Sequence, residues 1–164
     1  MDGGVTDFEA WAEARVAGLL RFAYLVTGSQ HAAEDAVQAA LTRACEKWSR
    51  VGCTHDPDSY VRRMVVNEHI STWRRSGRRE VAVAEVRDTV VVDAAAGVAD
   101  SDAVWRMCSA LPRRQRAAVV LRFYEDLEYA EIAALLDCSE ATVRSHVHRA
   151  LTSLRASLTS QEER

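Results

Sequence analysis

Apolar residues recur along the N-terminal half of the chain at the three- and four-residue spacing of an amphipathic helix. This pattern predicts a helix from Phe8 to Thr27, with apolar positions at Phe8, Trp11, Ala12, Leu19, Phe22, Ala23 and Val26. Gly28 stands where a glycine commonly ends a helix, and Ser29 is of the residue type that caps the next one. The sequence therefore predicts two consecutive helices that meet at these residues.

The second helix is predicted to extend from Ser29 to Trp48 and to have two unlike faces. Its apolar face carries Ala33, Ala36, Val37, Ala40, Leu41, Ala44 and Trp48. Its polar face carries Glu34, Asp35, Gln38, Thr42, Arg43 and Glu46. A polar loop is expected to follow from Ser49 to His55.

The stretch Asp56-Pro57-Asp58-Ser59 predicts the start of a third helix. Aspartate can cap a helix, proline fits the first helical position, and acids there complement the helix dipole. We expect this helix to run to about Arg75, with Gly77 where it would stop. The residues available for burial are Val61, Met64, Val65 and Trp73.

Helical periodicity is lost over residues 80–103. The run Val90-Val91-Val92 is compatible with a short strand, but no partner strand is apparent, so a linker is the favoured interpretation. Helical patterns resume at about Ala103, break at Pro112 and continue through three short helices. The chain is therefore predicted to be all-α, with domains at residues 1–79 and 104–164 joined by the linker 80–103.

The segment from Tyr129 to Leu151 is typical of two short helices hinged at Cys138-Ser139. One apolar face is formed by Ile132, Ala133 and Leu136, and the other by Val143, Val147, Ala150, Leu151 and Leu154. Ser139 can cap the second helix, and Asp137 tolerates the left-handed conformation that such turns need. This spacing predicts a helix-turn-helix.

Composition and charge narrow the class of protein. The 164 residues are 48% hydrophobic and 27% charged, and four scattered cysteines form no CxxC pair, which favours reduced thiols and a cytoplasmic location. The N-terminal segment carries acids where a signal peptide would carry basic residues. The net charge is −3, yet residues 60–79 hold six arginines against one glutamate, and residues 80–103 hold six acids against one arginine. This reversal of charge indicates a boundary near residue 80.

Two surfaces have side chains that suit nucleic acid. The outer face of the last predicted helix carries Glu140, Ala141, Arg144, Ser145, His148 and Arg149, and its arginines can bond guanine edges or phosphates. In the third helix, a polar stripe contains Arg63, Asn67, Ser71 and Arg74, and the central amide can bond a base edge. The alternatives are a hairpin with solvated arginines, and an Asn67 that caps a helix break or satisfies a buried carbonyl.

Three segments, in this order, resemble successive blocks of the bacterial extracytoplasmic-function sigma factors, and most closely the SigE-like group. They are AAEDAVQAALTRACEKW, DPDSYVRRMVVNEHISTWRRSGRRE and LPRRQRAAVVLRFYEDLEYAEIAALLDCSEATVRSHVHRALTSLR. The resemblance covers roughly residues 8–157. It implies sigma region 2 in residues 1–79 and sigma region 4 in residues 104–164, joined by a flexible linker. Such proteins bind core RNA polymerase and direct it to promoters, and many are held by an anti-sigma factor that is often membrane-bound.

The resemblance also implies residue roles. The Ser29–Trp48 helix would dock on the β′ clamp coiled coil of the polymerase, whose β flap is a further contact. The implied residues for polymerase are Asp35, Gln38, Ala39 and Thr42. Ala39 replaces a commoner acid there, and Leu41 a commoner phenylalanine. The minus-ten element would be recognised and opened by Arg63, Asn67, Ser71, Arg74 and Arg75. The minus-35 element would be read by Glu140, Arg144, Ser145, His148 and Arg149.

The acidic linker has two interpretations, which stay open: it lines a basic RNA exit channel of the polymerase, or it only keeps a tether soluble. No cofactor, metal or small-molecule substrate is expected. One alternative function is a stand-alone helix-turn-helix regulator of LuxR type, which leaves the first 79 residues without a role. Another is an enzyme, but no P-loop, nucleophile elbow or HExxH occurs, and Cys53-Thr54-His55 offers only two metal ligands.

Overall fold

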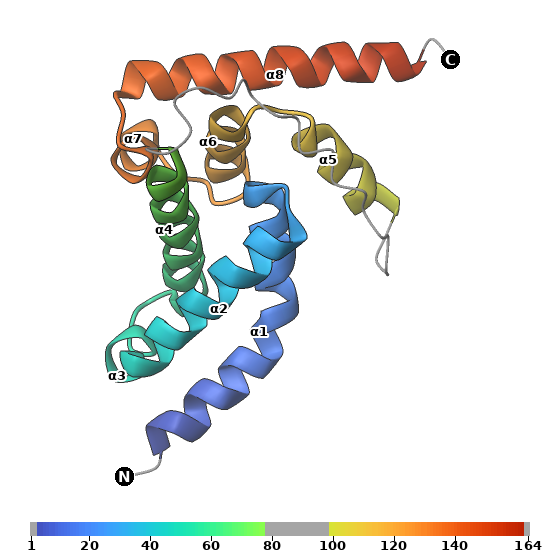
Figure 1. The fold of residues 1–164 in the computed structure, drawn as a ribbon. Helices are drawn as coiled ribbons and strands as arrows, with labels where there is room; N and C mark the ends of the chain where they lie inside the picture. Colours follow the sequence, from blue (N-terminus) through green and yellow to red (C-terminus); the bar gives the residue numbers. More distant parts are fainter. Residues whose placement is uncertain (1–2, 78–98, 163–164) are drawn as a thin grey trace. The chain divides into compact units, whose positions relative to one another are not determined.

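The computed structural model describes residues 3–77 and 99–162, and every regular element in these two ranges is an α-helix (Figure 1). The all-α prediction is confirmed. The chain divides into two compact units, Met1–Ala82 and Val83–Arg164, which are treated separately below. The Val90-Val91-Val92 run lies outside the described residues, and the predicted linker limits of residues 80 and 103 stay a prediction.

The described part of the first unit contains four helices: α1 (Gly3–Thr27), α2 (Gln30–Glu46), α3 (Trp48–Val51) and α4 (Pro57–Gly77). α1, α2 and α4 pack against one another pairwise. The residues of α2 that face this core are small, which lets its neighbours approach closely. The fully or almost fully buried side chains are Leu19, Phe22, Ala23, Val26, Ala33, Ala36, Val37, Ala40, Ala44, Val51, Val61, Val65, Val66 and Ile70.

The predicted ends of these helices are confirmed where a local signal defines them. Gly28 has φ 69°, the left-handed conformation that glycine adopts without strain, and it ends α1. Ser29 Oγ accepts a hydrogen bond from the Ala32 amide at 3.3 Å and so caps α2. Asp56 Oδ1 accepts a hydrogen bond from the Ser59 amide at 3.0 Å at the start of α4. Each cap satisfies an amide that the first helical turn leaves unpaired.

Two predictions in the same unit were wrong. The second helix ends at Glu46 rather than Trp48, and the expected polar loop contains the short helix α3. The cause is packing with α1: the ring of Trp48 lies 5.3 Å from that of Phe8 and 5.0 Å from that of Trp11, centre to centre. Val51, at the end of α3, is fully buried. Aromatic contacts of this kind stabilise by about 0.5–1.5 kcal/mol beyond simple burial.

The second unit contains α5 (Ala99–Ser109), α6 (Arg113–Phe123), α7 (Tyr129–Leu136) and α8 (Glu140–Glu162). α8 packs against α6 and α7. The break at Pro112 is confirmed, because Pro112 is the residue just before α6. The core contains Cys108, Leu111, Ala117, Ala118, Val119, Val120, Leu121, Leu127, Ile132, Ala133, Leu136, Val143, Val147 and Ala150.

Two boundaries in this unit differ from the prediction. α5 begins at Ala99, four residues before the expected Ala103, and α8 is 23 residues long rather than short. Serine and threonine side chains in the distal part of α8 bond back to the carbonyl one turn earlier; Thr159 Oγ1, for example, donates to the Arg155 carbonyl at 3.1 Å. Because these hydroxyl groups form hydrogen bonds within the helix, they need no partner from another part of the protein.

One arginine joins α5 to α6. Arg116 of α6 donates through Nε to the Cys108 carbonyl at 3.0 Å, and through Nη2 to the carbonyls of Ser109 and Leu111 at 3.1 and 2.9 Å. The last carbonyls of a helix have no partner within the helix. Arg116 provides that partner and closes the end of α5 against the core.

Candidate nucleic-acid and protein interfaces

The first candidate surface is the exposed face of α2. The residues predicted there are Asp35, Gln38, Ala39 and Thr42. All four line one shallow depression of the surface, together with Arg43 and Glu46. Thr42 Oγ1 donates to the Gln38 carbonyl at 2.9 Å, so this threonine is held along the helix. The structure therefore brings the four predicted residues together on one face.

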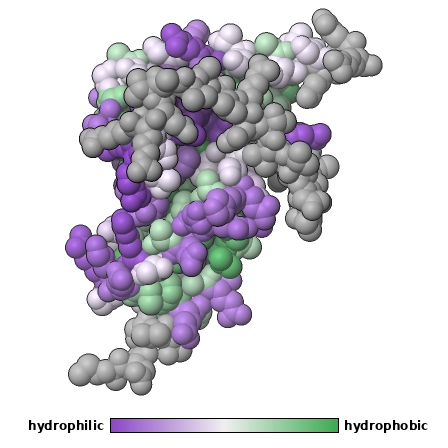
Figure 2. Space-filling view, in the orientation of Figure 1, coloured by the Kyte–Doolittle hydropathy of each residue, from purple (hydrophilic) through white to green (hydrophobic). Residues whose placement is uncertain are grey.

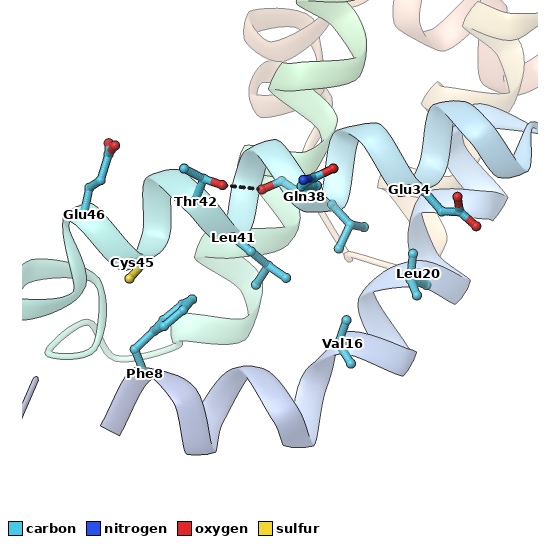
Figure 3. A pocket seen from close by; sticks show the side chains of 10 residues that line it. Phe8, Val16, Leu20, Glu34, Gln38, Leu41, Thr42, Cys45 and Glu46 are labelled. Atoms are coloured by element: carbon cyan, nitrogen blue, oxygen red, sulfur yellow. Dashed lines mark hydrogen bonds between the residues drawn. The ribbon is translucent and has the colours of Figure 1, made fainter. Parts of the chain in front are cut away.

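An apolar groove of about 640 Å³ lies between α1 and α2, next to this face (Figure 3). Phe8 of α1 points toward Cys45 and Leu41 of α2 at one end of the groove, and Leu20 of α1 lies near Glu34 of α2 at the other end. The other lining residues are Glu34, Val37, Gln38, Thr42 and Glu46, so no basic side chain lines it. In Figure 2, hydrophobic surface over these helices is bordered by hydrophilic residues.

Sequence reasoning did not find this groove. Leu41 was assigned to the buried face of its helix, but it is only half-buried and faces the groove. Val16 is exposed, with 36% of its surface accessible, and was not assigned to any face. The one available signal was Val16, an apolar residue among the polar positions of α1. The periodicity of one helix does not show which second helix completes a groove with it.

The second candidate surface is the polar stripe of α4. The predicted residues Arg63, Asn67, Ser71, Arg74 and Arg75 are all exposed. Asn67 lies in the middle of a helix that continues from Pro57 to Gly77, so it does not cap a break. Because Asn67 is exposed, it does not lie in the core either. Its amide is available to a ligand on the same side as the four other side chains.

The opposite side of α4 ties the helix to its unit. Glu68 is buried and forms an ion pair with Arg43 of α2. His69 is also buried, and its ring stacks on that of Trp73 at 5.8 Å.

At the start of α4, Asp58 accepts a hydrogen bond from Trp11 Nε1 at 2.9 Å and pairs with Arg15 Nε at 2.8 Å. These contacts hold the exposed stripe in a defined orientation relative to α1 and α2.

The third candidate surface is the helix-turn-helix formed by α7 and α8. Asp137 has φ 53°, so it occupies the left-handed conformation that the turn requires. Ser139 Oγ accepts a hydrogen bond from the Thr142 amide at 3.1 Å and caps α8. At the other end of α7, Glu128 and Glu131 form a reciprocal capping box. The predicted motif is confirmed in its turn, its cap and its two buried faces.

The outer face of α8 is free of core contacts. Its exposed residues are Glu140, Ala141, Arg144, Ser145, His148 and Arg149, while Val143, Val147 and Ala150 on the inner face are buried. Arg144 Cζ lies 4.8 Å from the centre of the Tyr129 ring, and its Nη2 lies 3.5 Å from Glu140 Oε2. Sequence reasoning did not identify Tyr129 as part of this surface.

His146 of α8 has a perturbed environment that the sequence pattern did not indicate. Burial lowers the pKa of its imidazole, and the positive charges of Arg114 and Arg149 lower it further. No hydrogen-bond partner for its buried Nδ1 is present within the described residues. The fold therefore favours the neutral form of this side chain.

The described residues contain no group of three or more His, Cys, Asp or Glu side chains arranged to hold a metal ion. In the same part of the chain, no helix has both the length and the apolar character needed to cross a bilayer.

Comparison with known proteins decides the family. Residues 11–79 match the family described as Sigma-70 region 2, and residues 101–154 match Sigma-70, region 4. The RNA polymerase sigma-E factor of Streptomyces avermitilis is 34% identical over 160 residues, which cover 98% of this chain and 89% of that protein. The ECF RNA polymerase sigma factor SigE of Mycolicibacterium smegmatis is also 34% identical, over 82% of this chain and 55% of that relative. The chain belongs to the extracytoplasmic-function sigma factors.

Solved structures have the same fold. The sigma factor RpoE of Bartonella quintana, solved in complex with the anti-sigma factor NepR, superposes with a TM-score of 0.64 at 24% identity, covering 93% of this chain and 97% of that one. Mycobacterium tuberculosis SigJ gives a TM-score of 0.54 at 25% identity, covering 88% of this chain and 52% of that one. These similarities agree with the two helical regions seen here.

The family membership settles the general function. This sigma factor binds core RNA polymerase and promoter DNA and directs transcription initiation, and it is not itself an enzyme. The LuxR-type alternative is wrong, because the match to region 2 covers residues for which a stand-alone regulator has no role. The predicted order of region 2 before region 4 is confirmed.

Proposed function

We propose that this sigma factor binds the polymerase mainly through the exposed face of α2, opens the minus-ten element with α4 and reads the minus-35 element with α8. The observation that carries the proposal is that each of the three predicted residue sets lies on one side of a helix whose other side is buried, and that every member is exposed except Ala39, which is half-buried. Each set is thus displayed on a rigid support, which lowers the entropic cost of binding.

The polymerase contact centres on Asp35, Gln38, Ala39 and Thr42, which would meet the β′ clamp coiled coil. Their carboxylate, amide and hydroxyl groups suit a partner with hydrogen-bond donors. We include the apolar groove in this contact because it shares Gln38, Thr42 and Glu46 with the same face. An apolar centre, such as this groove, with a polar rim is the usual composition of protein interfaces.

Region 4 would contact the β flap.

The α4 stripe suits the opened minus-ten element. Holding an unstacked base costs a few kcal/mol and requires a group that bonds the base edge. The amide of Asn67 is such a group, and the exposed Arg63, Arg74 and Arg75 are placed to neutralise phosphates beside it. The local excess of arginine over acid in residues 60–79 favours a single-stranded nucleic acid on this surface.

The outer face of α8 suits the major groove at the minus-35 element. A recognition helix contacts base edges with residues near its N-terminus, and Arg144, Ser145, His148 and Arg149 lie in the first three turns of α8. Arginine can form two hydrogen bonds with one guanine, and each such pair contributes about 1–3 kcal/mol of discrimination.

The net charge of −3 explains why these surfaces need the polymerase. Affinity for free DNA comes largely from lysine and arginine that release counterions, and this chain has fewer basic than acidic residues. Binding to the polymerase would place both regions beside the promoter and raise their effective concentration. The proposal further includes a cytoplasmic location and, as in the Bartonella complex, an anti-sigma partner.

In vitro transcription with purified core polymerase and genomic fragments tests the proposal. The protein should give new, discrete start sites that core polymerase alone does not give. A gel shift without polymerase should show only weak binding to the same promoters. Tight, specific binding by the isolated protein, or an unchanged set of start sites, would contradict the proposal.

A further inference from the structure

Two neighbours hold the side chain of Arg144 on the outer face of α8. The ring centre of Tyr129 lies 4.8 Å from Arg144 Cζ, and Glu140 Oε2 lies 3.5 Å from Arg144 Nη2. The side chain of Arg144 is nevertheless 60% exposed. An arginine on a helix surface normally samples many rotamers, and a ligand must immobilise it. Here the side chain is already restrained and still accessible.

The ring of Tyr129 is itself anchored from the preceding helix. Arg122 of α6 has its Cζ 5.4 Å from the centre of the ring. Arg122 Nη1 donates to the Leu127 carbonyl at 3.1 Å and lies 3.6 Å from Asp126 Oδ1. Because Arg122 is fixed at the turn between α6 and α7, the ring that contacts it has a defined place in front of α8.

Glu140 and Tyr129 hold Arg144 by different means. Glu140 pairs with Nη2 and so competes for a nitrogen that a guanine would also need. An aromatic ring attracts the guanidinium through its π electrons and uses none of its N–H groups. Tyr129 can therefore continue to hold Arg144 while the N–H groups of the arginine bond a base edge.

We infer that Tyr129 is a specificity-determining residue of the minus-35 interface, which acts by pre-ordering Arg144 for one base pair. The inference rests on the proposed role of α8 in reading that element. Tyr129 is a positioning residue, because its effect on the base passes through the arginine. Its loss should reduce discrimination at the base pair that Arg144 reads and leave the other base pairs of the element unaffected.

Transcription by core polymerase with the full-length protein tests this, on a promoter that the wild type uses and on a set of single base-pair substitutions across its minus-35 element. Arg144→Ala identifies the base pair whose substitution no longer matters. Tyr129→Leu and Tyr129→Met should lower discrimination at that same base pair by about three- to tenfold. Tyr129→Phe keeps the aromatic ring and should therefore keep the wild-type discrimination at that base pair. Tyr124→Leu, at an exposed tyrosine beyond α6, is the matched control and should behave as wild type.

The double variant Tyr129→Leu with Arg144→Ala separates positioning from a general structural effect. It should discriminate no worse than Arg144→Ala alone, since the tyrosine acts only through the arginine. Thermal unfolding identifies any variant that has lost its fold, and the two non-aromatic replacements serve as checks on each other. Full discrimination in a folded Tyr129→Leu or Tyr129→Met protein overturns the inference, as does a loss spread evenly over the element.

The variants distinguish a failure of base reading by Arg144 from a failure of its positioning by Tyr129. If Arg144→Ala changes discrimination at no base pair, the assignment of Arg144 to base reading is wrong and the inference falls with it, whereas Arg149→Ala still tests the proposed role of α8. If Arg144→Ala has its effect and the two non-aromatic replacements do not, the inference alone is wrong. Damage by Tyr129→Phe equal to that by Tyr129→Leu also overturns the inference, because it would assign the effect to the hydroxyl group rather than the ring.

Discussion

Arg43 of α2 forms an ion pair with Glu68 of α4, and this pair joins the helix proposed to bind polymerase to the helix proposed to open DNA. The side chain of Glu68 is only 10% exposed, while that of Arg43 is 59% exposed and lines the edge of the α2 surface. A buried carboxylate needs a partner, because it loses the hydration it has in the unfolded chain.

Arg43→Ala should therefore destabilise region 2. We expect a loss of about 1–3 kcal/mol, since the change leaves the buried Glu68 carboxylate without its ion-pair partner but with some access to water. Chemical denaturation monitored by the tryptophans of this region measures the effect. Arg50→Ala, at an exposed arginine of α3, is the control and should change stability by less than about 0.5 kcal/mol. Equal stability of the two variants would show that the pair is not needed.

Asp35→Ala and Val16→Asp test the polymerase contact from its polar and apolar sides. Each should weaken binding to core polymerase by about tenfold, corresponding to about 1.4 kcal/mol. Val16→Asp places a charge in the apolar groove, and Val16 is exposed enough for the fold to tolerate it. Fluorescence anisotropy of the labelled protein with core polymerase gives the affinities, with Arg50→Ala again as control. If Val16→Asp binds core polymerase with unchanged affinity, the groove is not part of the polymerase contact.

Asn67→Ala should impair promoter opening more than polymerase binding. The amide is exposed on α4 and contributes nothing to the core, so the variant should fold normally. We expect the fraction of opened promoter to fall by about tenfold, in line with the loss of one good base contact. Permanganate reactivity of unpaired thymines measures opening, and anisotropy measures binding. Equal losses in the two assays would reject a specific role in opening.

Arg149→Ala should weaken transcription from promoters that depend on a minus-35 element. The expected loss is about 1–3 kcal/mol if the arginine contacts a base, and it should vanish on a promoter whose upstream element has been scrambled. Transcription from the two templates, each compared with wild type, gives the result. A loss of the same size on the scrambled template would place the effect elsewhere in the protein.

His146 predicts a dependence of stability on pH. Its pKa is below the ordinary value of 6.5 in the folded protein, mainly through burial, and returns to that value on unfolding. The unfolded chain therefore binds the proton more readily, so His146 reduces stability as the pH falls from 7.5 through 6.5 toward 5.5. The melting temperature of His146→Gln should therefore fall less than that of wild type as the pH is lowered over this range. His148→Gln, at an exposed histidine, should follow the wild-type curve; coincidence of all three curves would remove His146 as a cause.

Much of the fold and of the candidate surfaces was predictable from the sequence because it depends on local order. Gly28, Ser29, Asp56 and Ser139 act within one helical turn, and all four behave as predicted. The helical period likewise separated buried from exposed positions on α8, so its outer face was identified before the structure. The roles of these exposed residues in binding polymerase and DNA stay predictions.

The sequence by itself determined an all-α chain, its principal caps and the polar faces of α2, α4 and α8, since each of these follows from residues close together along the chain. Only the tertiary structure decided the rest: α3 held by Trp48 against α1, the α1–α2 groove, and the contact of Tyr129 with Arg144. These features join residues that are distant along the chain. They depend on which helices pack together and at what angle, and helical periodicity contains no information on either.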